Sequence, residues 1–192
     1  MKTASALALA GLLAIVPPAS AAHRDGEVVT YGADCGASGC RAGGTSIDIK
    51  GADGRDYSIP VARSPYVLAD GTIVIYPGES LVFEIPGGDT PGTPHLLADG
   101  ASAGPGAATL TLNYSVRDTM MELNISNGFD KSLKLDAYLG SPRGDSWSLH
   151  YTSSCTVLPH IFDMESWPAP LGPIFISNIR YLPAGGTTMT CD

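Results

Sequence analysis

The sequence predicts an all-β protein: an antiparallel β-sandwich of roughly nine or ten short strands, stapled by disulfides. After residue 21, no window of 11–18 residues repeats apolar side chains at helical spacing. Short alternating or β-branched stretches instead recur between turn residues, at the spacing typical of sandwiches. Gly 23 and Pro 15 among 192 residues make the chain rich in turns. Because no crossover helix is available, we expect antiparallel pairing.

Residues 1–21 have the pattern of a signal peptide. Lys2 precedes an apolar run from Ala4 to Val16, and Ala19-Ser20-Ala21 fits the small-residue rule for signal peptidase. The run is shorter than the ~20 residues that a membrane span needs. We therefore expect an exported protein, periplasmic or extracellular, with no membrane span and with a single domain over residues 22–192.

The charge balance argues against nucleic acid as a partner. Without the leader, which removes only Lys2, 10 basic residues face 19 acidic ones. No segment concentrates Lys or Arg into the basic patch that displaces phosphate counterions. The acidity is therefore interpreted as favouring solubility.

The strands expected in the first half are separated by Gly, Pro and Asp-Gly turns. The clearest is a hairpin in which Asp70-Gly71 supplies the residues of a primed turn, since both tolerate positive φ. Residues 80–85 then alternate Leu81, Phe83 and Ile85 on one face. The expected strands are Glu27–Tyr31, Thr45–Lys50, Asp56–Val61, Tyr66–Leu68, Thr72–Tyr76 and Ser80–Ile85.

Residues 86–108 are predicted to form one long loop. The stretch consists mainly of Gly, Pro, Ala, Ser and Thr, with Leu96-Leu97 as its apolar pair. Loops of this length are uncommon unless they have a function or are disordered. The length of this loop therefore suggests a function or disorder, but the sequence does not indicate which.

The second half predicts a further hairpin and separate late strands. Leu110, Leu112, Tyr114 and Val116 alternate along the first arm of the hairpin, and a loop is expected over residues 140–145. The expected strands are Thr109–Val116, Thr119–Ser126, Leu133–Leu139, Ile174–Leu182 and Thr187–Cys191.

Four cysteines in an exported chain indicate two disulfides. Cys35 and Cys40 enclose only Gly36-Ala-Ser-Gly39, which is flexible enough to bring the two cysteines together. That pairing leaves Cys155 and Cys191 for each other. The second bridge would tie the tail of the chain to its body.

An alternative interpretation makes Cys155 a metal ligand. Cys155, His160 and Met164 follow one another at a spacing that resembles the copper-binding loop of the cupredoxins. By this resemblance, His95 would supply the fourth ligand, and the protein would carry electrons or copper. Copper on Cys155 would leave Cys191 as an odd thiol, so the disulfide is the more economical interpretation, with no cofactor.

The remaining motifs favour binding over catalysis. No Gly-x-Ser-x-Gly elbow is present, and we assign no catalytic residue. Trp147, Tyr151 and Trp167 flank Cys155 and could form an aromatic contact surface, although such residues more often pack beside a disulfide. The sequence thus predicts an exported binding or structural module with an unidentified protein or glycan partner.

Overall fold

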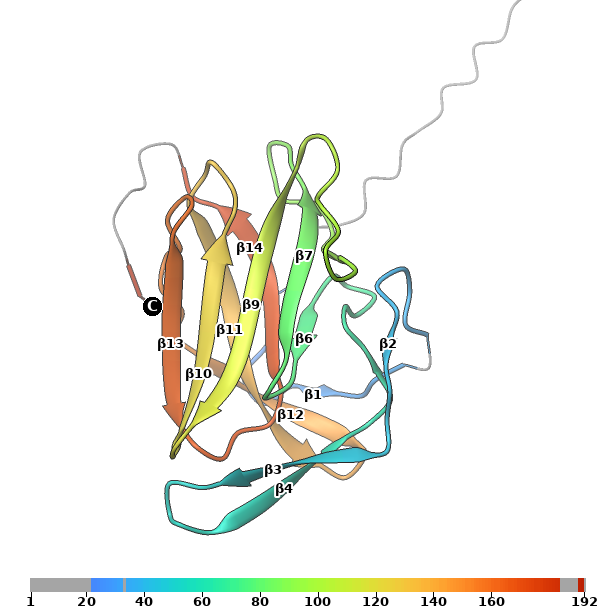
Figure 1. Cartoon of the computed structure of the whole chain (residues 1–192), viewed down its shortest axis with the longest axis vertical. Helices are drawn as coiled ribbons and strands as arrows, with labels where there is room; N and C mark the ends of the chain where they lie inside the picture. Colours follow the sequence, from blue (N-terminus) through green and yellow to red (C-terminus); the bar gives the residue numbers. More distant parts are fainter. Residues whose placement is uncertain (1–21, 33, 184–189, 192) are drawn as a thin grey trace, which may run out of the picture.

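Two five-stranded antiparallel sheets face each other in the computed structural model, which describes residues 22–32, 34–183 and 190–191 (Figure 1). The first sheet has the order β1-β12-β11-β14-β6, and the second has the order β13-β10-β9-β7-β8. The first comprises β1 (Val28–Val29), β12 (Ser146–Thr152), β11 (Leu133–Arg143), β14 (Ile174–Tyr181) and β6 (Ile73–Ile75). The second comprises β13 (Phe162–Pro168), β10 (Met120–Asn127), β9 (Ala107–Arg117), β7 (Ser80–Pro86) and β8 (His95–Leu96).

The second sheet has one buried and one exposed face. Along β9, Leu110, Leu112 and Tyr114 are fully buried, whereas Asn113 between them is exposed. The register pairs Leu112 with Leu81 of β7 on one side and with Ile125 of β10 on the other. The apolar period of two predicted from the sequence therefore forms one half of the core.

The first sheet is covered on both faces. Ile174, Phe175 and Ile176 are consecutive in β14, so their side chains point alternately to opposite faces, yet all three are fully buried. Tyr31 stacks on Phe175 with ring centroids 6.2 Å apart. The N-terminal segment therefore covers one face of this sheet, which explains why residues 174–176 of β14 are a continuous apolar run.

Two further pairs of strands complete the fold. β3 (Thr45–Lys50) and β4 (Asp56–Val61) form a hairpin across the lower end of the sandwich in Figure 1, and β2 (Cys40–Arg41) pairs with β5 (Ser64–Pro65). Beside β2, the buried Arg41 side chain forms a salt bridge with Glu79 and donates hydrogen bonds to the carbonyl oxygens of Pro65 and Val74.

The predicted fold class and both disulfides are confirmed, but the strand count is corrected. The described residues contain 14 strands rather than nine or ten, partly because four of them span only two residues. The loop expected over 140–145 is wrong, since β11 runs on to Arg143 and turns at Gly144 into β12. The strands β2, β5, β8, β12 and β13 were not expected, and β8 lies within the stretch 86–108 that was expected to be one loop.

Some expectations fall on residues that the structure does not describe. The signal peptide over residues 1–21 lies outside them, as does most of the strand expected over 187–191. The Asp70-Gly71 turn is present, with Gly71 at a φ of 85° and the Leu68 amide donating to the Thr72 carbonyl at 2.8 Å. Within the described ranges, no helix is long and apolar enough to cross a membrane.

Candidate functional site

A cavity of about 490 Å³ opens at the end of the sandwich where β7, β10 and β14 finish, the upper end in Figure 1. This volume falls within the range of small-molecule sites. Small residues dominate the lining, together with two aromatic rings and three polar side chains. The lining residues are Gly87, Gly88, Ala103, Gly106, Ala107, Ala108, Thr109, Gly128, Phe129, Asp130, Lys131 and Tyr181.

Glycines allow the loops around this cavity to approach each other closely. The Gly128 amide donates to the Thr109 carbonyl at 2.9 Å, and a Cβ on Gly128 would lie 2.6 Å from Thr109 Oγ1. Gly87 similarly donates to the Gly106 carbonyl at 2.9 Å, and its Cβ would lie 2.6 Å from that oxygen. Larger side chains at these positions would force the loops apart. The close approach of these loops therefore requires glycine at both positions.

Lys131 spans the cavity from one loop to the other. Its Nζ donates to the Gly88 carbonyl at 3.1 Å and lies 4.4 Å from the centre of the Tyr181 ring. Tyr181 packs edge-on against Phe129, with centroids 5.6 Å apart. Burial raises the pKa of the Tyr181 hydroxyl, so this group is a neutral hydrogen-bond donor. A cation, a hydroxyl group and an apolar wall thus meet in one hollow.

Asn127 holds the loop that carries Lys131. Its buried side-chain amide donates to the carbonyls of Lys131 at 2.9 Å and Val157 at 3.0 Å, and its Oδ1 accepts from the Phe129 amide at 2.9 Å. These bonds connect the loop after β10 to the segment that precedes β13. Asn127 is therefore a positioning residue for this wall, although nothing in the sequence distinguishes it from other asparagines in turns.

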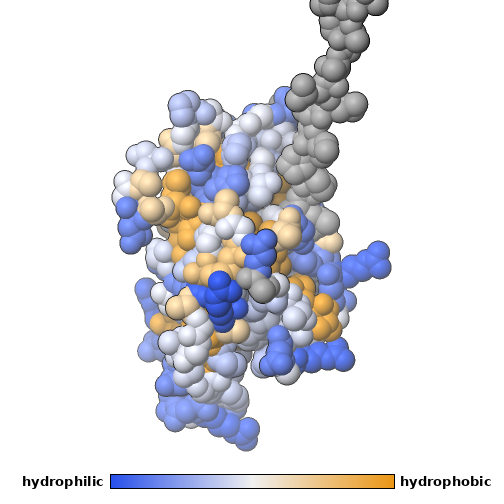
Figure 2. Space-filling view, turned by 90° about the vertical axis from the view of Figure 1, so that its right-hand side faces the viewer, coloured by the Kyte–Doolittle hydropathy of each residue, from blue (hydrophilic) through white to orange (hydrophobic). Residues whose placement is uncertain are grey.

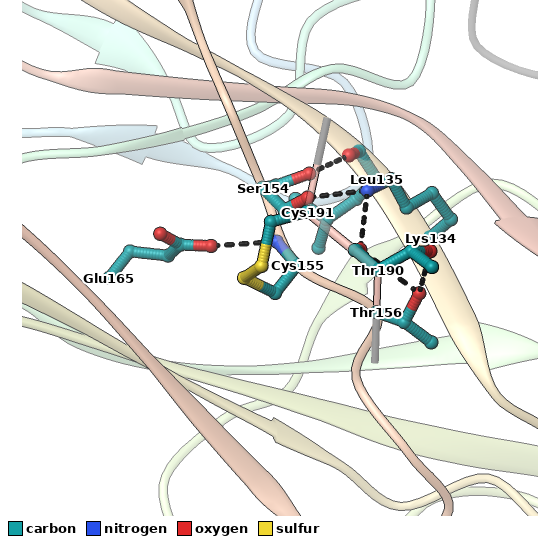
Figure 3. Close-up of a disulfide and its surroundings, with 8 residues drawn as sticks. All are labelled: Lys134, Leu135, Ser154, Cys155, Thr156, Glu165, Thr190 and Cys191. Atoms are coloured by element: carbon teal, nitrogen blue, oxygen red, sulfur yellow. Dashed lines mark hydrogen bonds between the residues drawn. A yellow bond between two sulfur atoms is a disulfide. The ribbon is translucent and has the colours of Figure 1, made fainter. Parts of the chain in front are cut away.

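The four cysteines form the pairs expected from their spacing. Cys35 pairs with Cys40, with Cα atoms 5.1 Å apart, and Cys155 pairs with Cys191, with Cα atoms 4.0 Å apart. Figure 3 shows the second bridge joining the tail to the chain that follows β12. The tail is thus tied to the body as predicted.

The structure does not assemble the alternative copper ligands. His95 lies on β8 and Met164 on β13, at opposite edges of the second sheet. Four strand spacings separate these edges, about 19 Å at roughly 4.8 Å each. The exposed His160 ring contacts Asp130 at 2.8 Å, and Cys155 Sγ is bonded to Cys191. The resemblance to the cupredoxin loop therefore extends to sequence spacing only.

The three predicted aromatic residues do not form one surface. Trp147 is 5% exposed and packs edge-on against Tyr76 in the core. Trp167 is half-buried and donates its indole N–H to Thr152 Oγ1 at 2.8 Å, whereas Tyr151 is exposed beside Tyr138. Trp147 and Tyr151 are four residues apart in β12 and therefore lie on the same face of the sheet, but only Trp147 belongs to the buried core. This contact-surface prediction is wrong for Trp147.

Two smaller cavities lie beside β8, on the side of the molecule that Figure 2 presents with patches of apolar surface. One, of about 350 Å³, is lined by Leu81, Leu96 and Leu97 among others, and the second, of about 210 Å³, by Val67, Pro94 and His95 among others. Residues between 87 and 106 contribute to all three cavities. The stretch 86–108, which its composition singled out, therefore contributes to the walls of all three cavities.

Comparisons of the chain with protein-family models, curated proteins and solved structures find no match.

Proposed function

We propose that this protein is an exported binding module that takes a saccharide unit in the cavity at the end of its sandwich. The observation that carries the proposal is the combination of a cavity of about 490 Å³ with aromatic, cationic and hydroxyl groups from separate loops. Ligand sites of this size generally combine apolar walls with a few placed polar groups. The proposal is one of binding rather than catalysis.

The lining favours a ligand rich in hydroxyl groups. Lys131 and the Tyr181 hydroxyl can donate hydrogen bonds, while Asp130 and Thr109 Oγ1 can accept them. The Phe129 and Tyr181 side chains that line the cavity provide apolar area for the C–H groups of a sugar. A purely apolar ligand would leave Lys131 and Asp130 without new partners, which makes a polar ligand the better match.

Export is the second part of the proposal, and two features support it. Residues 1–21 have the pattern of an export signal, and two disulfides are typical of proteins in an oxidising compartment. Soluble or surface-bound polysaccharides outside the cell are then the source of the ligand.

A matched pair of substitutions in one loop tests the site. Ala103→Phe places a ring in the cavity, whereas Ala101→Phe adds the same ring to the same loop outside this cavity, where Ala101 lines the hollow beside Leu96. Both variants and the wild type would be titrated with neutral and uronic-acid oligosaccharides by calorimetry. We expect binding by the wild type and by Ala101→Phe, and none by Ala103→Phe.

The reverse result would contradict the proposal. Binding that survives in Ala103→Phe and is lost in Ala101→Phe would move the site to the hollow beside β8. A wild type that binds extended peptides and none of the saccharides would replace a glycan partner with a protein partner.

A further inference from the structure

The Cys155–Cys191 disulfide lies beside two carboxylates that the proposed binding site does not use. Asp163 and Glu165 are two residues apart in β13, so both side chains point to the inward face of this edge strand. The Cys155 amide donates to Glu165 Oε1 at 2.8 Å, which holds Cys155 beside Glu165 (Figure 3). Cys155 Sγ and one carboxylate oxygen from each acid all lie within 4.8 Å of one another.

One of these two acids also carries an unsatisfied acceptor. Asp163 is 9% exposed, and its Oδ2 has no hydrogen-bond partner. A buried carboxylate oxygen without a partner is costly, and proteins generally satisfy such an atom with a donor or a cation. Burial also raises the pKa of Glu165, and the neighbouring Asp163 adds to this effect. The pair of carboxylates therefore lacks part of the positive charge that would stabilise it.

Lys134 is the nearby cation, and its ammonium group has other partners. It donates to the carbonyl oxygens of Ser154 and Thr190, the residues that immediately precede the two cysteines (Figure 3). Lys134 thus holds both segments that carry the disulfide. Its charge offsets one of the two carboxylates, which leaves a net charge of −1 when both acids are ionised. A thiolate on Cys155 would make this −2.

We propose that Cys155, Asp163 and Glu165 form a Zn²⁺ site when the Cys155–Cys191 disulfide is reduced. A divalent cation would neutralise the charge of −2 that reduction creates. Thiolate and carboxylate are both zinc ligands, at about 2.3 Å and about 2.1 Å, and in a tetrahedral site they lie about 3.5 Å apart. Rotations of the three side chains would close the present separations to this value, and water would fill the fourth position.

The reductant required is a dithiol. Its two thiols become a disulfide, the Sγ–Sγ bond of Cys155 and Cys191 breaks, and each cysteine sulfur takes one proton. Zn²⁺ then replaces the proton on Cys155, which passes to solvent. Cys191 is exposed, so an incoming thiolate can reach the bridge. Disulfide and metal are in this way two alternative states of the same sulfur.

Cys191→Ser tests the site without a reductant, because it leaves Cys155 as a permanent thiol. Cd²⁺ would serve as the spectroscopic probe, through its thiolate charge-transfer band, and Zn²⁺ would be measured by competition. We expect one ion per chain in Cys191→Ser and no band in the oxidised wild type. Adding Asp163→Asn to Cys191→Ser should weaken binding at least about tenfold, since it removes a ligand.

Cys40→Ser is the matched control. It frees Cys35, which belongs to no such three-ligand group among the described residues. An equal cadmium affinity in Cys40→Ser and Cys191→Ser would show that any free thiol of this protein suffices, and would overturn the proposal. So would an affinity of Cys191→Ser that is unchanged by Asp163→Asn and Glu165→Gln together.

A second measurement keeps the native cysteines, in case Cys191→Ser does not fold. The wild type would be equilibrated with dithiol and disulfide forms of a reagent at fixed free Zn²⁺, and its thiols counted by alkylation and mass spectrometry. We expect Zn²⁺, and not Mg²⁺, to raise the reduced fraction of Cys155, and we expect no such rise in Asp163→Asn/Glu165→Gln. A reduced fraction that does not respond to Zn²⁺ contradicts the site.

Discussion

Replacing Arg41 with alanine should lower the free energy of unfolding by about 3–5 kcal/mol, the usual cost of removing one partner from a buried ion pair. The Arg41 side chain is 5% exposed and meets Glu79 through two nitrogens, with Nη2 2.9 Å from Oε2. It also stacks against the Tyr66 and Tyr76 rings, 4.1 and 5.0 Å from their centroids. Alanine would remove the cationic partner of the Glu79 carboxylate, which would keep the Tyr76 amide as a donor, and the Arg41 hydrogen bonds to two carbonyl oxygens.

The contacts of Arg41 decide how large the loss is. Its guanidinium donates to the Pro65 carbonyl at 3.0 Å and to the Val74 carbonyl at 2.7 Å, so it joins β2, β5 and β6. Hydrogen bonds to a charged group contribute about 1.5–3 kcal/mol each, and their simple sum would exceed the whole effect, because water replaces part of them. Arg41→Lys keeps the charge but not the planar fork, so we expect it to lose about half as much.

Urea unfolding followed by tryptophan fluorescence would measure these losses, with an unchanged m-value as the check that the unfolding transition stays comparable. Arg55, which is 80% exposed and 3.6 Å from Asp53, is the matched control, and Arg55→Ala should leave the midpoint unchanged. A double-mutant cycle with Glu79→Gln should show strong coupling. A loss below about 1 kcal/mol for Arg41→Ala, or no coupling with Glu79, would refute the reasoning.

Three further predictions concern other parts of the fold. Asn127→Ala should cost about 2–4 kcal/mol in urea unfolding, because it removes several buried hydrogen bonds of about 1 kcal/mol each; a loss near zero would mean that water replaces them. Replacing Cys155 and Cys191 by alanine should cost about 4 kcal/mol from loop entropy over a separation of 36 residues, and a loss below 1 kcal/mol would contradict this. Burial raises the pKa of Glu165 above its ordinary 4.5, so ionisation opposes folding and the wild type should lose stability as pH rises from 4.5 through the folded pKa. The Glu165→Gln variant should not show this loss. Parallel stability-against-pH profiles for the wild type and the variant would contradict the prediction.

The sequence predicts the parts of the fold where one face of a strand is apolar or where a turn needs particular residues. The alternation of Leu110, Leu112 and Tyr114 becomes the inward face of β9, and Asp70-Gly71 forms its turn. The pairing of the cysteines follows from the short loop between Cys35 and Cys40. Each of these features depends on residues that are close together in the sequence, so it can be predicted from a short stretch of the chain.

β13 shows why other parts could not be predicted. Its inward residues include the acids Asp163 and Glu165, while Phe162 and Met164 are 64% and 54% exposed. This reverses the usual pattern, so hydrophobic alternation does not reveal the strand. Ser146–Thr152 does alternate, with Trp147 and Leu149 buried, and a strand there could have been found from that pattern.

The candidate site was harder still to predict, for a different reason. Its walls are built mainly from glycine and alanine, which carry no recognisable side-chain chemistry. Lys131 and Tyr181 are 50 positions apart in the sequence. The pairing of β11 with β14 brings these two residues together at one end of the sandwich. The composition of residues 86–108 indicated a region of interest, but not the partners that face it.

The inward acids of β13 also affect how this protein behaves when it is concentrated. An edge strand with exposed Phe162 and Met164 offers a template on which a second copy could extend the sheet. A symmetric antiparallel contact centred on Met164 would set Asp163 of each molecule opposite Glu165 of the other. Repulsion between these carboxylates opposes the contact. The same two side chains therefore oppose pairing of two molecules through this edge strand.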